Sequence, residues 1–119
     1  MNKYEYRHYT RKGETKLNLP DNVAALQKKV KSIGRAVGKK SKDTGWKGGV
    51  KSTSHQYNAD RLAWSGWHAD CESMFTLSVD GQPVARTYDC HGQGWFEFLN
   101  EKTINKIFNQ VFPEHGADA

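Results

Sequence analysis

The residues best suited to chemistry are two histidines and two cysteines in the second half of the chain. His68 precedes Cys71 by three positions, and Cys90 is followed directly by His91. Imidazole nitrogens and thiolates are ligands that Zn²⁺ prefers, so these four residues form a candidate zinc site. However, the paired CxxC or HxxxH units of structural zinc sites are absent, and adjacent strand residues point to opposite faces. We therefore assign no metal and no cofactor.

The same histidines offer an acid–base alternative. His68 and His91 are accompanied by Asp70, Glu72 and Asp89, and two imidazoles with a carboxylate could serve a small metal-free ribonuclease. No nucleophile motif accompanies them: the GxSxG, HExxH, EF-hand and Cys–His protease patterns are all absent. A non-enzymatic role is therefore favoured.

Charge is distributed unevenly along the 119 residues. Residues 1–51 contain fourteen lysines and arginines against four acidic residues, whereas residues 52–119 contain four basic and nine acidic residues. The first part thus carries a net charge of +10 and the second −5. Such asymmetry indicates contact with nucleic acid or another polyanion, or else a basic half that the acidic half neutralises in the fold.

The first element predicted to position these charges is a helix. Pro20 ends the preceding segment, Asp21 can cap a helix, and Gly38 can stop it. Five apolar residues recur with the helical period and predict a buried stripe: Val23, Leu26, Val30, Ile33 and Val37. The lysines and Arg35 then take the outer faces of this helix, and residues 39–54 follow as a flexible basic loop rich in Gly, Lys and Ser.

The predicted binding residues are the exposed cations of this helix and loop, with one tryptophan able to stack on a base. They are Lys28, Lys31, Arg35, Lys39, Lys40, Lys42, Trp46, Lys47 and Lys51. Because lysine outnumbers arginine among them, we expect little sequence specificity.

Hairpins account for most of the remaining chain. Residues 3–19 are predicted to turn at Lys12-Gly13, residues 55–68 to form one strand, and residues 71–90 to turn at Asp80-Gly81. A regular two-residue turn at Asp80-Gly81 would pair Cys71 with Cys90 and bury both, together with Phe75, Leu77 and Tyr88. Another strand at Trp95–Leu99 precedes a helix capped by Asn100, with a stripe of Ile104, Ile107, Phe108 and Val111 that ends before Pro113.

The predicted fold is a single α+β domain spanning residues 1–119, with two helices packed on an antiparallel sheet and a frayed tail at 114–119. This sheet would combine the first hairpin with a meander of three or four strands. We expect a small nucleic-acid-binding module in the cytoplasm, since no membrane span or signal segment is visible and the two cysteines suit a reducing compartment. The alternative is a phage- or plasmid-type inhibitor that docks on an acidic protein surface. The oligomeric state stays open, a homodimer included.

Overall fold

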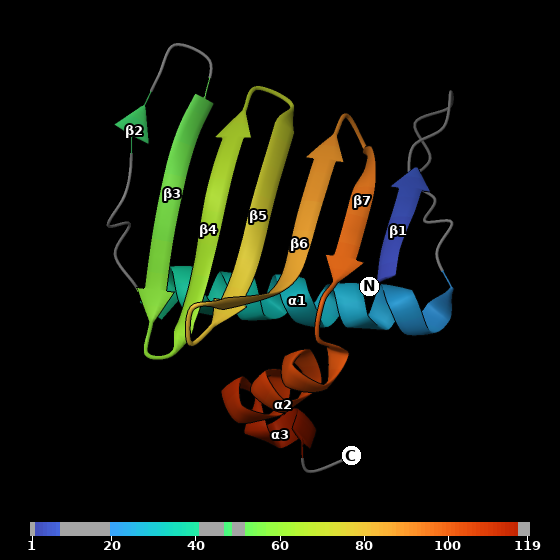
Figure 1. Ribbon diagram of the computed structural model, residues 1–119, viewed down its shortest axis with the longest axis vertical. Coiled ribbons are helices and arrows are strands. Elements are labelled where there is room, and N and C mark those ends of the chain that lie inside the picture. The colour runs from blue at the N-terminus through green and yellow to red at the C-terminus, as the bar shows by residue number, and fades with distance from the viewer. Residues whose placement is uncertain (1, 8–19, 41–46, 49–51, 117–119) are drawn as a thin grey trace.

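The described part of the chain forms one antiparallel sheet with a long helix across one face (Figure 1). The computed structural model describes residues 2–7, 20–40, 47–48 and 52–116. The strand order is β1-β7-β6-β5-β4-β3-β2, so that β3 to β7 form a meander and β1 joins it at β7. In chain order the elements are β1 Asn2–Arg7, α1 Asp21–Lys40, β2 Lys47–Gly48, β3 Ser52–Ala59, β4 Leu62–Ala69, β5 Glu72–Val79, β6 Gln82–Cys90, β7 Gln93–Phe98, α2 Glu101–Val111 and α3 Pro113–Gly116. This α+β architecture confirms the predicted fold class, with a meander longer than expected.

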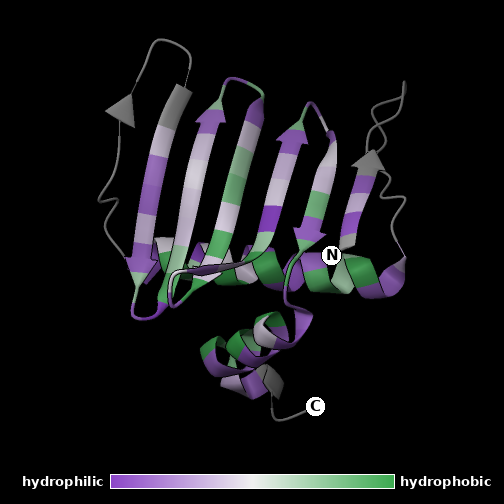
Figure 2. Ribbon diagram, in the orientation of Figure 1, coloured by the Kyte–Doolittle hydropathy of each residue, from purple (hydrophilic) through white to green (hydrophobic). Residues whose placement is uncertain are grey.

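Helix α1 forms where the sequence predicts it and continues past Gly38 to Lys40. The carbonyl oxygen of Pro20 accepts hydrogen bonds from the amides of Val23 (3.0 Å) and Ala24 (2.9 Å), which begins the first turn. All five residues of the predicted apolar stripe are buried, with at most 8% of the surface exposed. Figure 2 shows hydrophobic segments alternating with hydrophilic ones along α1, as expected of a helix with one buried side.

Residues 55–68 form two strands, so the prediction of one strand is wrong. Strands β3 and β4 are joined by a tight turn at Asp60-Arg61, where Asp60 has a φ of 55°. Aspartate tolerates this left-handed conformation better than most residues do, but it is a weaker turn signal than glycine. The turn is held against the neighbouring hairpin, because the Asp80 amide donates to the Arg61 carbonyl oxygen (2.8 Å).

The turn at Asp80-Gly81 is present, but the predicted register of its hairpin is wrong. Both residues have positive φ, at 52° and 80°, as a tight hairpin turn requires. A β-bulge between Leu77 and Ser78 then shifts the pairing, so that Leu77 lies opposite Ala85 and Glu72 opposite Cys90. The extra residue of the bulged strand sends every later side chain of β6 to the other face of the sheet.

This shift overturns the predicted cysteine pair. Cys71 precedes β5 and is exposed, whereas Cys90 is half-buried, and both are free thiols. The shift also moves Tyr88 away from the face that carries Phe75 and Leu77.

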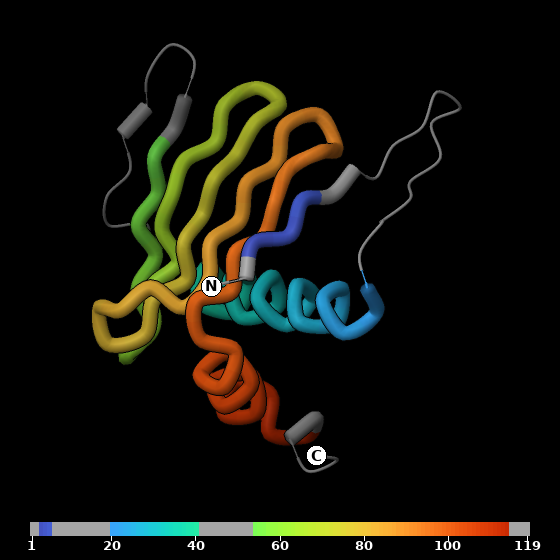
Figure 3. Tube along the Cα trace, turned by 45° about the vertical axis from the view of Figure 1, so that its right-hand side comes forward, coloured from blue at the N-terminus to red at the C-terminus, as the bar shows by residue number. Residues whose placement is uncertain are grey.

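The second helix lies beside α1, beyond the lower ends of the strands (Figure 3). Asn100 caps α2 as predicted, since its Oδ1 accepts a hydrogen bond from the Thr103 amide at 3.0 Å. Two residues of its apolar stripe are buried, and two more pack against the core: Ile104, Ile107, Phe108 and Val111. Lys29 joins the two helices, because its Nζ donates to Asn105 Oδ1 at 2.9 Å. Residues 114–116 belong to the short helix α3.

Strand β1 pairs with β7 along its whole length. The predicted return strand after Lys12-Gly13 lies outside the described residues. The predicted loop at 39–54 is partly structured. Its first two lysines are the last residues of α1, Lys47–Gly48 form β2, and residues 52–54 are the first residues of β3. No helix in the described segments is long and apolar enough to cross a membrane.

Candidate nucleic-acid interface

The predicted cations of α1 divide between two sides of the helix. Lys28, Lys31, Arg35 and Lys39 are spaced by three or four residues, which places them along one side, and all four are exposed. Lys40 lines a small pocket between α1, the β3–β4 turn and α2, and it shares a second hollow, distinct from the groove between α1 and the sheet, with Arg35 and Lys39. The other predicted residues are not placed: Lys42, Trp46 and Lys51 lie outside the described residues, and so does the side chain of Lys47.

The cationic side of α1 forms one wall of an open groove of about 550 Å³. Helix α1 crosses the lower part of the curved sheet, which leaves the upper part of that face open (Figure 1). The wall consists of Lys31, Gly34, Arg35, Gly38 and Lys39, and the floor consists of Tyr57, Trp64, Ser73, Phe75 and Thr87. Three of the five predicted cations with described side chains therefore border one groove.

The floor of the groove is an array of nearly parallel rings from β3, β4 and β5. Trp64 stacks on Phe75 with ring centroids 5.2 Å apart and an interplanar angle of 9°. His55 lies beyond Phe75 at 6.3 Å and 26°. Because the rings stack on one another and α1 rests on Trp64, the array offers mainly apolar ring edges to the groove, against which an unpaired nucleobase can pack.

Two glycines, Gly34 and Gly66, allow close contacts that shape the floor. A Cβ on Gly34 would lie 2.6 Å from the Trp64 ring, so glycine lets the helix rest on the indole. A Cβ on Gly66 would lie only 1.9 Å from the Met74 carbonyl oxygen, opposite Phe75. Any larger residue at either position would force the backbone or the ring to move.

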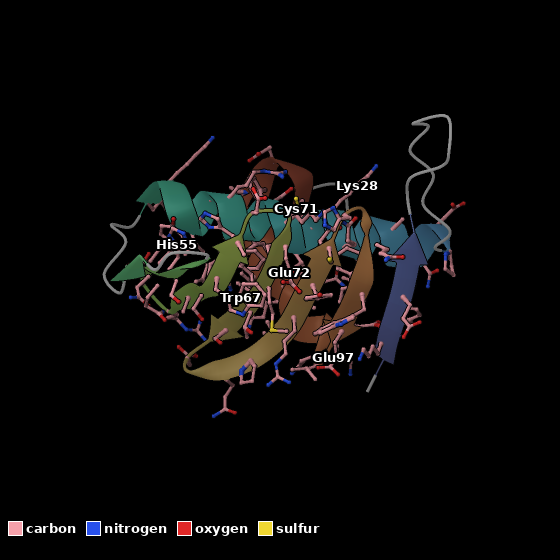
Figure 4. The ribbon with its side chains drawn as sticks, turned by 90° about the horizontal axis from the view of Figure 1, so that it is seen from above. Lys28, His55, Trp67, Cys71, Glu72 and Glu97 are labelled. Atoms are coloured by element: carbon pink, nitrogen blue, oxygen red, sulfur yellow. The ribbon has the colours of Figure 1, made fainter. Side chains whose placement is uncertain are left out.

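A hydrogen-bonded chain of three side chains borders the floor, and its central residue, His55, lies near the C-terminal part of α1 (Figure 4). The Tyr57 hydroxyl lies 3.0 Å from His55 Nδ1, and His55 Nε2 lies 3.0 Å from His68 Nδ1. If the hydroxyl donates to Nδ1, then His55 donates to His68, and the remaining nitrogen of His68 carries a proton as a donor. This chain can therefore present one hydrogen-bond donor beside the aromatic floor.

His68 thus has His55 as its partner. His91 lies in the β6–β7 turn with a φ of 53°, and its amide donates to the Cys71 carbonyl oxygen at 3.1 Å. His55 could not be singled out from the sequence, because its contact with His68 depends on the β3–β4 turn, which was not predicted.

Lys31 lies close to an aromatic ring of β7. Its Nζ lies 5.6 Å from the centre of the Phe96 ring. Burial lowers the pKa of the Lys31 amine, the carboxylate of Asp89 opposes this effect, and Arg35 adds a further lowering. Lys31 is itself exposed, like Arg35 and Lys39, so all three cations of the wall are open to a ligand from solvent.

The candidate zinc ligands do not assemble. Cys90 faces away from α1 beside Glu72, whereas His68 lies on the α1 side of the sheet beside Ser73. Among the described residues no group of three or more His, Cys, Asp or Glu side chains is arranged to hold a metal ion.

No family model matches this chain, and comparisons with curated proteins and with solved structures also give no match.

Proposed function

We propose that this protein binds single-stranded nucleic acid in the groove between α1 and the sheet. The observation that carries the proposal is the shared lining, with Lys31, Arg35 and Lys39 on one wall and Trp64 and Phe75 on the floor. Phosphates would contact the wall while bases stack on the floor. Proteins that bind single strands without sequence preference combine these two features.

The floor favours a single strand over a duplex. In a duplex the bases stack on each other and their faces are closed to protein side chains, whereas unpaired bases can leave the stack and lie on aromatic rings. Cations four residues apart on a helix are separated by about 6 Å along its axis. This spacing is of the order of the distance between neighbouring phosphates in an extended strand.

The positive charge on the α1 wall of the groove also supports a nucleic-acid ligand. Lys31, Arg35 and Lys39 line the groove together, and the carboxylate of Asp89 acts on Lys31. A cytoplasmic location fits this partner and the two free thiols.

The test is a binding titration with fluorescently labelled oligonucleotides at several salt concentrations. The variant replaces Lys31, Arg35 and Lys39 by glutamine, which removes three positive charges from the groove. If all three contact phosphates, the slope of log K against log salt should become shallower by about 2, since each contact on a single strand contributes roughly 0.7. Affinity at low salt should fall by at least tenfold.

A matched control removes the same charge from other surfaces. Lys40→Gln, Lys102→Gln and Lys106→Gln change exposed residues outside the groove and lower the net charge equally. This control should keep most of the affinity, and both triple variants should melt within a few degrees of the wild type. Equal loss in the two variants would show a response to net charge alone and would contradict the groove. A protein that co-purifies after nuclease treatment, with no oligonucleotide binding, would favour the inhibitor alternative.

A further inference from the structure

The face of the sheet opposite α1 is uncovered in the described part of the chain. Glu97 lies on this outer face, away from both helices (Figure 4). The strand register shows which other residues lie on this outer face, because directly paired residues of neighbouring strands share a face. Such a face is normally polar when it meets water.

A band of large side chains crosses the centre of this face. Trp67 pairs with Met74, Met74 with Tyr88, and Tyr88 with Trp95, so four neighbouring strands contribute one residue each to a single row. All four are half-buried, and the rings of Tyr88 and Trp95 stack with centroids 5.8 Å apart. The β-bulge at Leu77/Ser78 puts Tyr88 into this row, because without the shift it would face α1.

The charges around the band are of both signs and largely paired. Arg86 Nη1 lies 3.4 Å from Glu97 Oε1, and Lys3 Nζ lies 4.6 Å from the centre of the Trp95 ring. The Tyr88 hydroxyl donates to a carboxylate oxygen of Glu72. Because these charges largely cancel, the outer face lacks the excess of positive charge that would attract a polyanion. It suits a surface that is itself apolar at the centre and mixed in charge at the edge.

We propose that this face is the interface of a two-fold homodimer. The band, in the order Trp95, Tyr88, Met74 and Trp67, has a tryptophan at each end, so it is nearly symmetric about its middle. A two-fold axis parallel to the strands and between β5 and β6 sets Trp95 against Trp67 of the partner subunit. The same axis sets Met74 against Tyr88 of the partner subunit, a favourable sulfur–aromatic contact.

The residues beside the band leave space for the partner's rings. On β4 the outer-face residues on either side of the band, Ser65 and Ala69, are small, and so is Ser54, which pairs with Trp67 on β3. With strands about 4.8 Å apart and a rise of about 3.3 Å per residue, the band and the rows beside it span roughly 20 Å by 20 Å. Two such faces bury about 800 Å² in total, below the roughly 1,200–2,000 Å² of stable interfaces, so we expect a weak dimer. The two grooves point away from each other and stay open.

The test is the molar mass of the full chain, measured by sedimentation equilibrium from low to high micromolar concentration. The wild type should pass from monomer to dimer over this range. Met74→Glu inserts a charge at the centre of the band and should leave a monomer. Asn58→Glu inserts the same charge at an exposed outer-face position on β3, away from the band, and should dimerise like the wild type.

Folding and ligand binding are checked on the same samples. Trp67→Ser removes one ring of the band without adding charge and should weaken the dimer at least tenfold if Met74→Glu fails to fold. The molar mass tests the dimer independently of the proposed function. Oligonucleotide affinity should be unchanged in both variants. A wild type that stays monomeric throughout, or a dimer that Met74→Glu and Trp67→Ser leave intact, overturns the proposal. Loss of oligonucleotide binding in a folded Trp67→Ser monomer would make the band a nucleic-acid surface and would also overturn it.

Discussion

Replacing Gly34 by alanine tests how α1 rests on the sheet. Gly34 is a buried position of α1, and an added Cβ would lie 2.6 Å, 2.7 Å and 2.9 Å from three atoms of the Trp64 ring. Ordinary contacts begin at 3.4 Å, so the ring or the helix must move. The ring has little freedom, because Phe75 stacks on it with a centroid separation of 5.2 Å.

The expected magnitude follows from two opposing effects. Alanine in a helix is more favourable than glycine by about 1 kcal/mol. Forcing an extra methyl group into a packed site costs about 1–3 kcal/mol. We therefore expect Gly34→Ala to lower the free energy of unfolding by about 1 kcal/mol, which corresponds to a fall in Tm of roughly 4 °C in a domain of this size.

Gly38→Ala is the matched control, one turn further along the same side of α1. An added Cβ at Gly38 meets nothing within 4 Å, so the helical preference acts alone and stability should rise by up to about 1 kcal/mol. The assay is urea unfolding of both variants, followed by circular dichroism and tryptophan fluorescence. If Gly34→Ala is as stable as Gly38→Ala, the described packing of Trp64 beneath α1 is wrong.

Three further results are expected. Phe75→Leu should weaken oligonucleotide binding by roughly tenfold with an unchanged salt slope, because it removes stacking and leaves the charges in place; a changed slope would contradict this role. Asn100→Ala should cost about 1 kcal/mol in urea unfolding, since the Thr103 amide loses its acceptor, and an unaffected midpoint would argue against the cap. The hydrogen bond to Glu72 raises the pKa of Tyr88 to about 12, so its stabilising effect is complete below about pH 10 and is lost as the pH rises toward 12. Glu72→Gln should lower the pKa of the phenol in an absorbance titration, and a titration identical to that of the wild type would show that the contact is absent.

Local signals in the sequence predict the parts of the fold that depend on near neighbours. The period of Val30, Ile33 and Val37 identifies the buried side of α1, and Asp80-Gly81 identifies a turn, because each signal acts within a few residues. The same helical period identifies Lys31 and Arg35 as outer residues. One wall of the groove could therefore be predicted from the sequence.

The floor of the groove could not be predicted in this way, because it depends on which strands pair and in which register. The turn at Asp60-Arg61 contains no glycine, so β3 and β4 appeared as one strand and His55 was not placed beside His68. The bulge was equally hidden, since Val84 and Ala85 are both apolar and both buried, and either could face the core. Tyr88 was consequently assigned to the wrong face.

The most direct test of the central claim is photo-crosslinking of a halogenated single-stranded oligonucleotide, followed by mapping of the modified peptides. Binding in the groove predicts crosslinks to Tyr57, Trp64 or Phe75, which line its floor. These crosslinks should disappear when high salt releases the strand. Crosslinks confined to Trp67 and Trp95, on the opposite face of the sheet, would contradict the groove as the binding site.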